Sequence, residues 1–135
     1  LEQALERGLV HEAAWDIVLY QFVLEHLAEP RAELRTATRA LAPGGTLALI
    51  VPSMSTFELS VFGSAYRSLR ADHLHLFSAS SLEHELAAAG LRLISLQSDC
   101  NLHLLRGFLE PSQLQQLYAA GRGPDLTVLA RRTAA

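Results

Sequence analysis

The 135-residue chain has the length of one globular domain, and half of its residues are apolar, enough for a sizeable core. Its 11 basic residues, all arginine, face 14 acidic ones, and the net charge of −3 argues against a nucleic-acid binder or a basic membrane patch. No apolar run approaches the ~18–20 residues of a membrane span, and the single cysteine, Cys100, excludes an internal disulfide. These features predict a soluble, cytoplasmic, single-domain protein over residues 1–135.

Apolar runs and helical stripes alternate along the first half of the chain. A short helix is expected to end near Gly8. Near-continuous apolar runs at 15–20 and 46–51 predict strands covered on both faces, as in parallel sheets. Between them, a helix is expected to begin at Pro30 and to be stopped by a turn at Pro43-Gly44-Gly45. This βαβ unit predicts two parallel strands in one sheet.

The second half continues the alternation. Residues 53–71 mix aromatic and small polar residues and predict a short helix or a covering loop. The elements expected after them are a helix with a capping box at Ser80-Ser81-Leu82-Glu83 and a stop at Gly90, a strand at 91–96, a helix opening at Glu110-Pro111, and a last strand at 125–130. Alternating strands and helices predict an α/β fold.

Several motifs follow one another at characteristic spacings. They are Trp15-Asp16-Ile17-Val18, Phe22-Val23-Leu24-Glu25-His26-Leu27, Leu41-Ala42-Pro43-Gly44-Gly45, Val51-Pro52-Ser53, His73-Leu74-His75-Leu76-Phe77-Ser78 and Ala88-Ala89-Gly90-Leu91. In this order they resemble the second half of a class I S-adenosylmethionine-dependent methyltransferase. The resemblance covers residues 15–97 and the final strand. It implies a Rossmann-like sheet of order 3-2-1-4-5-7-6, of which this chain supplies strands four to seven with flanking helices and an antiparallel final strand.

The resemblance also implies an activity: methyl transfer from S-adenosylmethionine to a small-molecule acceptor, with residues 53–80 as a variable lid and substrate segment. Ligands of such sheets bind beyond the carboxyl ends of the strands, so Tyr20, Gln21 and Phe22 are expected to bind the cofactor. The alternative for these three residues is ordinary packing at the end of the strand. The alternative is a non-catalytic methyltransferase-like interaction domain that pairs through an open sheet edge.

Two motifs offer acid–base groups. Glu25 and His26 are either a catalytic pair beside the methyl donor or a cap of the first helical turn. His73 and His75 have the spacing that places two imidazoles on one face of an extended segment. One of them is a candidate general base, or both are hydrogen-bonded within a loop. Some relatives bind a metal through a further glutamate three residues before the pair's glutamate; Phe22 stands there, so no metal site is expected.

The family's first half carries a Gly-rich cofactor loop, and this sequence has no G-x-G that follows a strand. The chain begins at Leu1 and its only methionine is Met54, which suggests that a natural beginning is missing. The strand at 15–20 is then an open edge, a hazard for association. We expect an N-terminal segment, a second polypeptide or a second copy of the chain to cover it.

Overall fold

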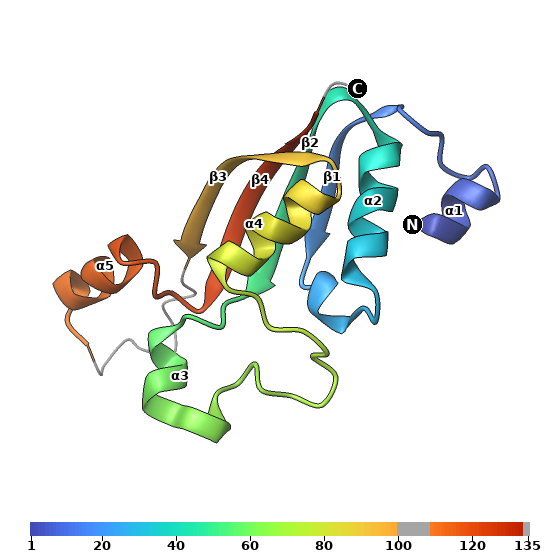
Figure 1. Ribbon diagram of the computed structural model, residues 1–135. Helices are drawn as coiled ribbons and strands as arrows, with labels where there is room; N and C mark the ends of the chain where they lie inside the picture. The colour runs from blue at the N-terminus through green and yellow to red at the C-terminus, as the bar shows by residue number, and fades with distance from the viewer. Residues whose placement is uncertain (100–108, 134–135) are drawn as a thin grey trace.

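A four-stranded sheet with the order β1-β2-β4-β3 forms the centre of the fold (Figure 1). The computed structural model describes residues 1–99 and 109–133. The strands are β1 (Trp15–Gln21), β2 (Leu41–Pro52), β3 (Leu91–Asp99) and β4 (Asp125–Arg132). β1 runs parallel to β2, whereas β4 is antiparallel to both of its neighbours, β2 and β3. This arrangement confirms the partial methyltransferase sheet and its antiparallel final strand.

Helices pack on one face of the sheet. In Figure 1, α2 and α4 lie in front of the strands, α1 lies beside α2, and α3 lies below the sheet. The bounds are α1 (Glu2–Glu6), α2 (Pro30–Ala40), α3 (Phe57–Phe62), α4 (Ala79–Ala88) and α5 (Pro111–Ala119), with single 3-10 turns η1 (Leu24–His26) and η2 (Gly63–Ala65). Within the described ranges, no helix combines the length and apolarity that crossing a bilayer requires.

Alternate strand residues build the core between the sheet and the two long helices. Because successive side chains of a strand point to opposite faces, one set from each strand meets α2 and α4. The fully buried members of this core include Leu47, Leu49 and Val51 of β2, Leu126 and Val128 of β4, Leu34 of α2, and Leu82 and Leu86 of α4.

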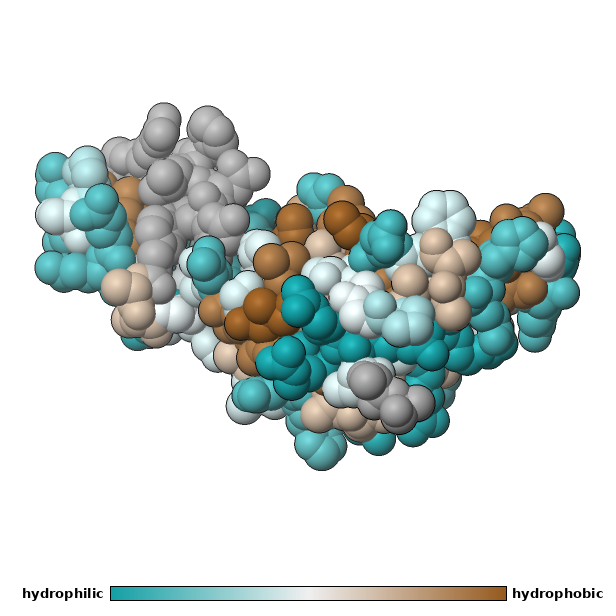
Figure 2. Space-filling model, turned by 90° about the horizontal axis from the view of Figure 1, so that it is seen from above, coloured by the Kyte–Doolittle hydropathy of each residue, from teal (hydrophilic) through white to brown (hydrophobic). Residues whose placement is uncertain are grey.

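The opposite face of the sheet carries apolar side chains that remain exposed. Ile17 and Leu19 of β1 are 67% and 58% exposed. The strand register places Leu19 beside Ala48 and Ala48 beside Leu129, which is 40% exposed. Viewed from above, apolar residues reach the surface in several groups between hydrophilic ones (Figure 2). In the described part of the chain, β1 is therefore covered on one face only, contrary to the prediction of a strand buried on both.

The free edge of β1 matches the expectation from the sequence. β1 is the terminal strand of the sheet and forms its ladder with β2. Its second row of backbone groups has no strand partner among residues 1–99 and 109–133. An edge of this kind presents unpaired N–H and C=O groups to any strand that approaches it.

The segment predicted as a turn belongs to β2. The helix ends at Ala40 and the strand begins directly at Leu41, ahead of Pro43-Gly44-Gly45. The register against β1 shifts here, since Trp15 lies opposite Leu41 but Ile17 lies opposite Thr46. The extra residues form an irregular, bulged stretch, which the positive φ of 77° at Gly44 makes possible.

Gly45 occupies a position without room for a side chain. A Cβ here would lie 2.9 Å from the carbonyl oxygens of Ala42 and Trp15. Because backbone atoms cannot move aside at low cost, we expect Gly45→Ala to lower the free energy of unfolding by about 2–3 kcal/mol, measured by urea denaturation. Gly44→Ala is the control: its Cβ meets nothing within 4 Å, and its positive φ alone costs about 1 kcal/mol. An equal loss in both variants would contradict the steric explanation.

The capping box of α4 lies two residues earlier than predicted. Ser78 is the N-cap, and its hydroxyl oxygen accepts a hydrogen bond from the backbone N–H of Ser81 at 3.1 Å. The hydroxyl oxygen of Ser81 in turn accepts from the backbone N–H of Ser78 at 2.9 Å. The assignment to Ser80 and Glu83 is wrong, because a serine hydroxyl takes the place that glutamate usually fills. The predicted end at Gly90 is confirmed by its φ of 81°.

An ion pair joins the two long helices. Nε and Nη2 of Arg31 each donate to a carboxylate oxygen of Glu85 at 2.7 Å. These hydrogen bonds lower the pKa of Glu85 below its ordinary value of 4.5. A carboxyl whose pKa is lowered by folding stabilises the folded state. This stabilisation is fully present when the pH lies above the ordinary pKa, and it is lost as the pH falls through the lowered pKa. In a double-mutant cycle of Arg31→Ala and Glu85→Ala, we therefore expect a small coupling at neutral pH that disappears in acid; a coupling unchanged by pH would contradict this.

Candidate functional site

A cavity of about 350 Å³ opens at the carboxyl ends of β1 and β2. Its walls come from the end of β1, the η1 turn, the end of β2, the segment 67–73 and the first residue of β4. Parallel strands direct ligand sites to this end of an α/β sheet. Phe22 and Pro52, which follow or end the two parallel strands, both line the cavity.

The three residues expected to bind the cofactor have different surroundings. Phe22 lines the cavity, is 41% exposed, and has a positive φ of 52°, a strained conformation for a bulky residue. Gln21 is exposed. Tyr20 is buried, and its hydroxyl donates to Oε1 of Glu33 on α2 at 2.7 Å. Burial, followed by this hydrogen bond, raises the pKa of Tyr20. Phe22 is thus the one of the three that lines the cavity.

Glu25 lies at the back of the cavity and is fully buried. Neither of its carboxylate oxygens has a hydrogen-bond partner among the residues that the structure describes. Its backbone carbonyl oxygen accepts from the N–H groups of Leu74 and His75 at 2.8 and 3.1 Å. The η1 turn is thereby tied to the extended segment that carries both histidines.

His26 and His73 meet beside this carboxylate. Their ring centroids are 4.7 Å apart in an edge-to-face arrangement. Nδ1 of His26 lies 2.7 Å from the carbonyl oxygen of Asp72, and Nδ1 of His73 lies 3.0 Å from that of Ser68. Because a carbonyl oxygen only accepts, each ring carries a proton on Nδ1, and in the neutral form Nε2 holds a lone pair. The sequence suggested two separate pairs, Glu25 with His26 and His73 with His75. The structure instead brings His26 of the first pair against His73 of the second.

His75 has other neighbours. Its ring stacks on Phe77 with centroids 6.0 Å apart, and it is not among the residues that line the cavity. The structure therefore separates the two histidines that the sequence placed on one face.

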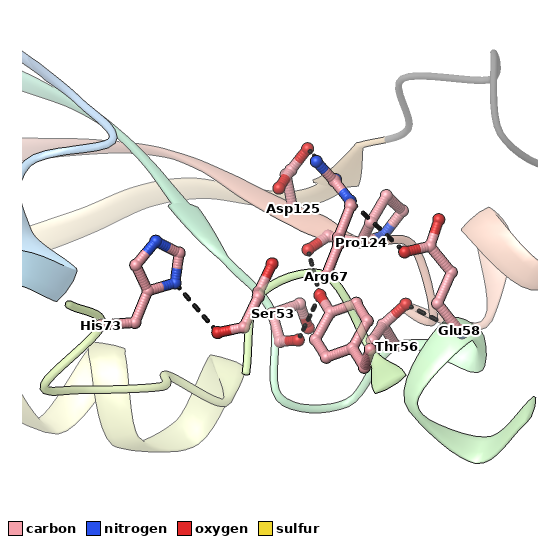
Figure 3. A network of polar contacts seen from close by, with 9 residues as sticks. Ser53, Thr56, Glu58, Arg67, His73, Pro124 and Asp125 are labelled. Atoms are coloured by element: carbon pink, nitrogen blue, oxygen red, sulfur yellow. Dashed lines mark hydrogen bonds and ion pairs between the residues drawn. The ribbon is translucent and has the colours of Figure 1, made fainter. Parts of the chain in front are cut away.

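A network of polar contacts continues from Arg67 and Asp125, which line the cavity (Figure 3). Nε of Arg67 lies 3.4 Å from Oε2 of Glu58, and its Nη2 lies 3.4 Å from Oδ2 of Asp125. Both carboxylates are buried. The hydroxyl of Tyr66 lies 3.3 Å from the carbonyl oxygens of Ser53 and Pro124. These contacts join segments far apart in the sequence, and no local motif signals them.

A second arginine pairs at the rim. Nε and Nη2 of Arg70 each donate to a carboxylate oxygen of Asp72 at 3.0 Å. Desolvation is the largest single influence on Asp72 and opposes its ionisation, but the hydrogen bonds and charge of Arg70, a backbone hydrogen bond and the charge of His73 together lower the pKa of this carboxyl. Both arginines of the cavity are thus engaged by carboxylates other than that of Glu25.

Solved structures share this fold. The methyltransferase in complex with the Trm112 activator from Haloferax volcanii has a TM-score of 0.66 and 17% identity over 93% of this chain and 57% of that chain. A SAM-dependent methyltransferase from Thermotoga maritima has a TM-score of 0.66 and 17% identity over 92% and 58%. The 1,6-didemethyltoxoflavin-N1-methyltransferase from Burkholderia thailandensis, solved with S-adenosylhomocysteine, has a TM-score of 0.57 and 17% identity over 92% and 46%. This chain therefore spans about half the length of these proteins.

Sequence comparison gives the family. None of the curated proteins matches the chain. The family model described as a methyltransferase domain matches residues 2–96, which is more than half of the 135 residues. The sheet order β1-β2-β4-β3 with its antiparallel β4 agrees with that match. The chain belongs to the methyltransferase-domain family.

Proposed function

We propose that this chain is part of a cytoplasmic, S-adenosylmethionine-dependent methyltransferase that acts on a small-molecule acceptor. The observation that carries the proposal is the cavity at the ends of β1 and β2, where Glu25, His26 and His73 meet in a chain of the methyltransferase family. Ligands of open α/β sheets bind at such strand ends.

One wall of the cofactor site is assigned to the end of β1. Phe22 offers an exposed apolar ring, and Gln21 offers an exposed amide beside it. The hydrogen bond from Tyr20 to Glu33 fixes the strand end against α2. When bound, the cofactor supplies an electrophilic methyl group on its sulfonium. The residues present fit one side of that molecule, and the Gly-rich turn for its amino-acid end is absent from these 135 residues.

The acid–base role is assigned first to His73. Its Nε2 lone pair would accept the proton that the acceptor loses on methylation. The carboxylate of Glu25 would then stabilise the imidazolium, and His26 would hold the ring edge-on. His75 remains a second candidate base. His73→Gln should remove most of the rate of methyl transfer, whereas His75→Gln should remove little of it. A larger loss in His75→Gln than in His73→Gln would assign the acid–base role to His75.

Calorimetric titration with S-adenosylmethionine tests the methyltransferase proposal. We would compare this chain with any longer natural form of the protein. Binding by the longer form supports the enzyme. Failure of both to bind would contradict it and favour an interaction domain.

The exposed edge of β1 supports that second candidate function. Ile17 and Leu19 are more than half exposed on a strand whose outer edge is free in the described ranges. We propose that an N-terminal segment or a second copy of the chain covers it. Sedimentation of the chain should show concentration-dependent association, which Leu19→Lys should weaken because a charge disfavours burial. A monomer at every concentration would exclude the second copy.

A further inference from the structure

Three potential metal ligands converge in the cavity from distant parts of the chain. Glu25 and His26 come from the η1 turn, and His73 comes from the extended segment before α4. One ligand atom from each lies within 4.8 Å of the others. The absence of a metal site was predicted from the sequence because Phe22 replaces a glutamate. The structure supplies another third ligand, from beyond β2.

The buried carboxylate of Glu25 has no arginine partner in the described part of the chain. The cavity is lined by three carboxylates, of Glu25, Asp72 and Asp125, and by two guanidinium groups, of Arg67 and Arg70. Arg70 pairs with Asp72 and Arg67 with Asp125. Both oxygens of Glu25 are left without a hydrogen bond in the described part of the structure. A carboxylate buried in this way needs a proton or a cation beside it.

Both imidazoles are already arranged as metal-ligating histidines are. A ligating histidine donates its other ring N–H to a carbonyl or carboxylate oxygen, which fixes the tautomer and the ring plane. His26 and His73 make such contacts through Nδ1, to the carbonyl oxygens of Asp72 and Ser68. The Nε2 atoms are therefore the free donors.

The backbone holds the ligands close to the required spacing. With bonds of about 2.0–2.1 Å to a tetrahedral Zn²⁺, ligand atoms lie about 3.4 Å apart, so a spacing of 4.8 Å closes by a shift of about 1 Å for each atom. Side-chain rotation provides such a shift. The hydrogen bonds from Leu74 and His75 to the carbonyl oxygen of Glu25 keep the histidine segment in place meanwhile.

We propose that Glu25, His26 and His73 bind a divalent transition-metal ion, of which Zn²⁺ is the best example. Two imidazoles and one carboxylate are a ligand set of catalytic zinc sites and of related iron sites. Because three protein ligands leave a coordination position open, water or an oxygen of an acceptor can occupy it. A ring nitrogen that holds the ion cannot also accept a proton, so His73 would not act as the base while it bound the ion.

Metal binding is tested directly, without reference to methyl transfer. The chelator-treated chain is titrated with Zn²⁺ by calorimetry, and with Co²⁺ by visible absorption. We expect one ion per chain, and little binding of Mg²⁺, which prefers oxygen ligands. Glu25→Gln and His73→Gln should each weaken Zn²⁺ binding by at least about 100-fold, the upper end of what loss of an outer-shell partner costs. His75→Gln and the exposed His84→Gln are controls that should keep the affinity.

A second measurement, made on the unaltered chain, tests the proposal even if the variants fail to fold. In nitrogen NMR of the unaltered chain, Zn²⁺ should shift the Nε2 resonances of His26 and His73, while Nδ1 of both stays protonated. Absence of stoichiometric Zn²⁺ binding would overturn the proposal, as would unchanged affinity in folded Glu25→Gln or shifts confined to other histidines. None of these results depends on whether S-adenosylmethionine binds.

Discussion

Replacing Leu24 by alanine is expected to lower the free energy of unfolding by about 2–5 kcal/mol. Leu24 is the first residue of η1 and is fully buried in the core cluster. Truncation removes its transfer free energy and leaves a cavity, because the packed sheet and helices collapse only in part. Urea denaturation followed by circular dichroism measures the loss.

The same substitution should also disturb the functional site. Leu24 directly precedes Glu25 and His26, so it anchors the turn that presents their side chains to the cavity. Val23→Ala is the matched control, because Val23 is adjacent but 38% exposed, and we expect it to cost less than about 1 kcal/mol. Zn²⁺ titration of the folded fraction should show weaker binding in Leu24→Ala than in Val23→Ala. Equal stabilities of the two variants would show that the turn is not anchored by this side chain.

Most of the individual strands and helices could be predicted from local patterns in the sequence. The apolar runs at β1 and β2, the proline at the start of α2 and the glycine after α4 each encode a conformation over a few residues. The order of the sheet was implied by the resemblance to class I methyltransferases, which the motifs carry, and not by periodicity. The single elements needed only neighbours along the chain, whereas the sheet order needed the resemblance.

The errors arise where tertiary contacts override a local pattern. Pro43-Gly44-Gly45 reads as a turn, yet pairing with β1 draws it into a strand. The capping box shifted to Ser78 because a serine at the third helical position makes the reciprocal contact. The apolar residues of β1 predict a strand buried on both faces, but apolarity does not determine what covers a strand.

The site itself could be predicted only in pieces. Glu25-His26 and His73 were each recognised, but their meeting depends on hydrogen bonds between the backbone of Glu25 and that of Leu74 and His75. The Nδ1 contacts that set the tautomers were also unpredictable: that of His26 reaches Asp72, far along the chain, and that of His73 depends on the local shape of the loop. The direction of the Tyr20 side chain could not be predicted for a similar reason, since its partner Glu33 belongs to a helix whose docking no motif encodes.

Tyr66→Ala is expected to cost about 3–5 kcal/mol of unfolding free energy, as for other buried aromatic side chains. Tyr66 is 1% exposed and lies where the end of β2 meets the start of β4. Burial raises the pKa of its phenol, so the hydroxyl stays protonated and acts as a donor to the carbonyl oxygens of Ser53 and Pro124. Its hydroxyl therefore links the two strand ends to the segment that leads to His73.

Comparison with Tyr66→Phe separates the ring from the hydroxyl. The phenylalanine keeps the packing and removes only a shared donor, and the Pro124 oxygen still accepts from the Ser53 N–H at 2.7 Å, so we expect a cost of about 1 kcal/mol. Leu69→Ala, at a 44% exposed position in the same segment, is the control and should cost less than either. If Tyr66→Phe proved as damaging as Tyr66→Ala, the hydroxyl contacts rather than ring packing would hold the two strand ends together at the cavity.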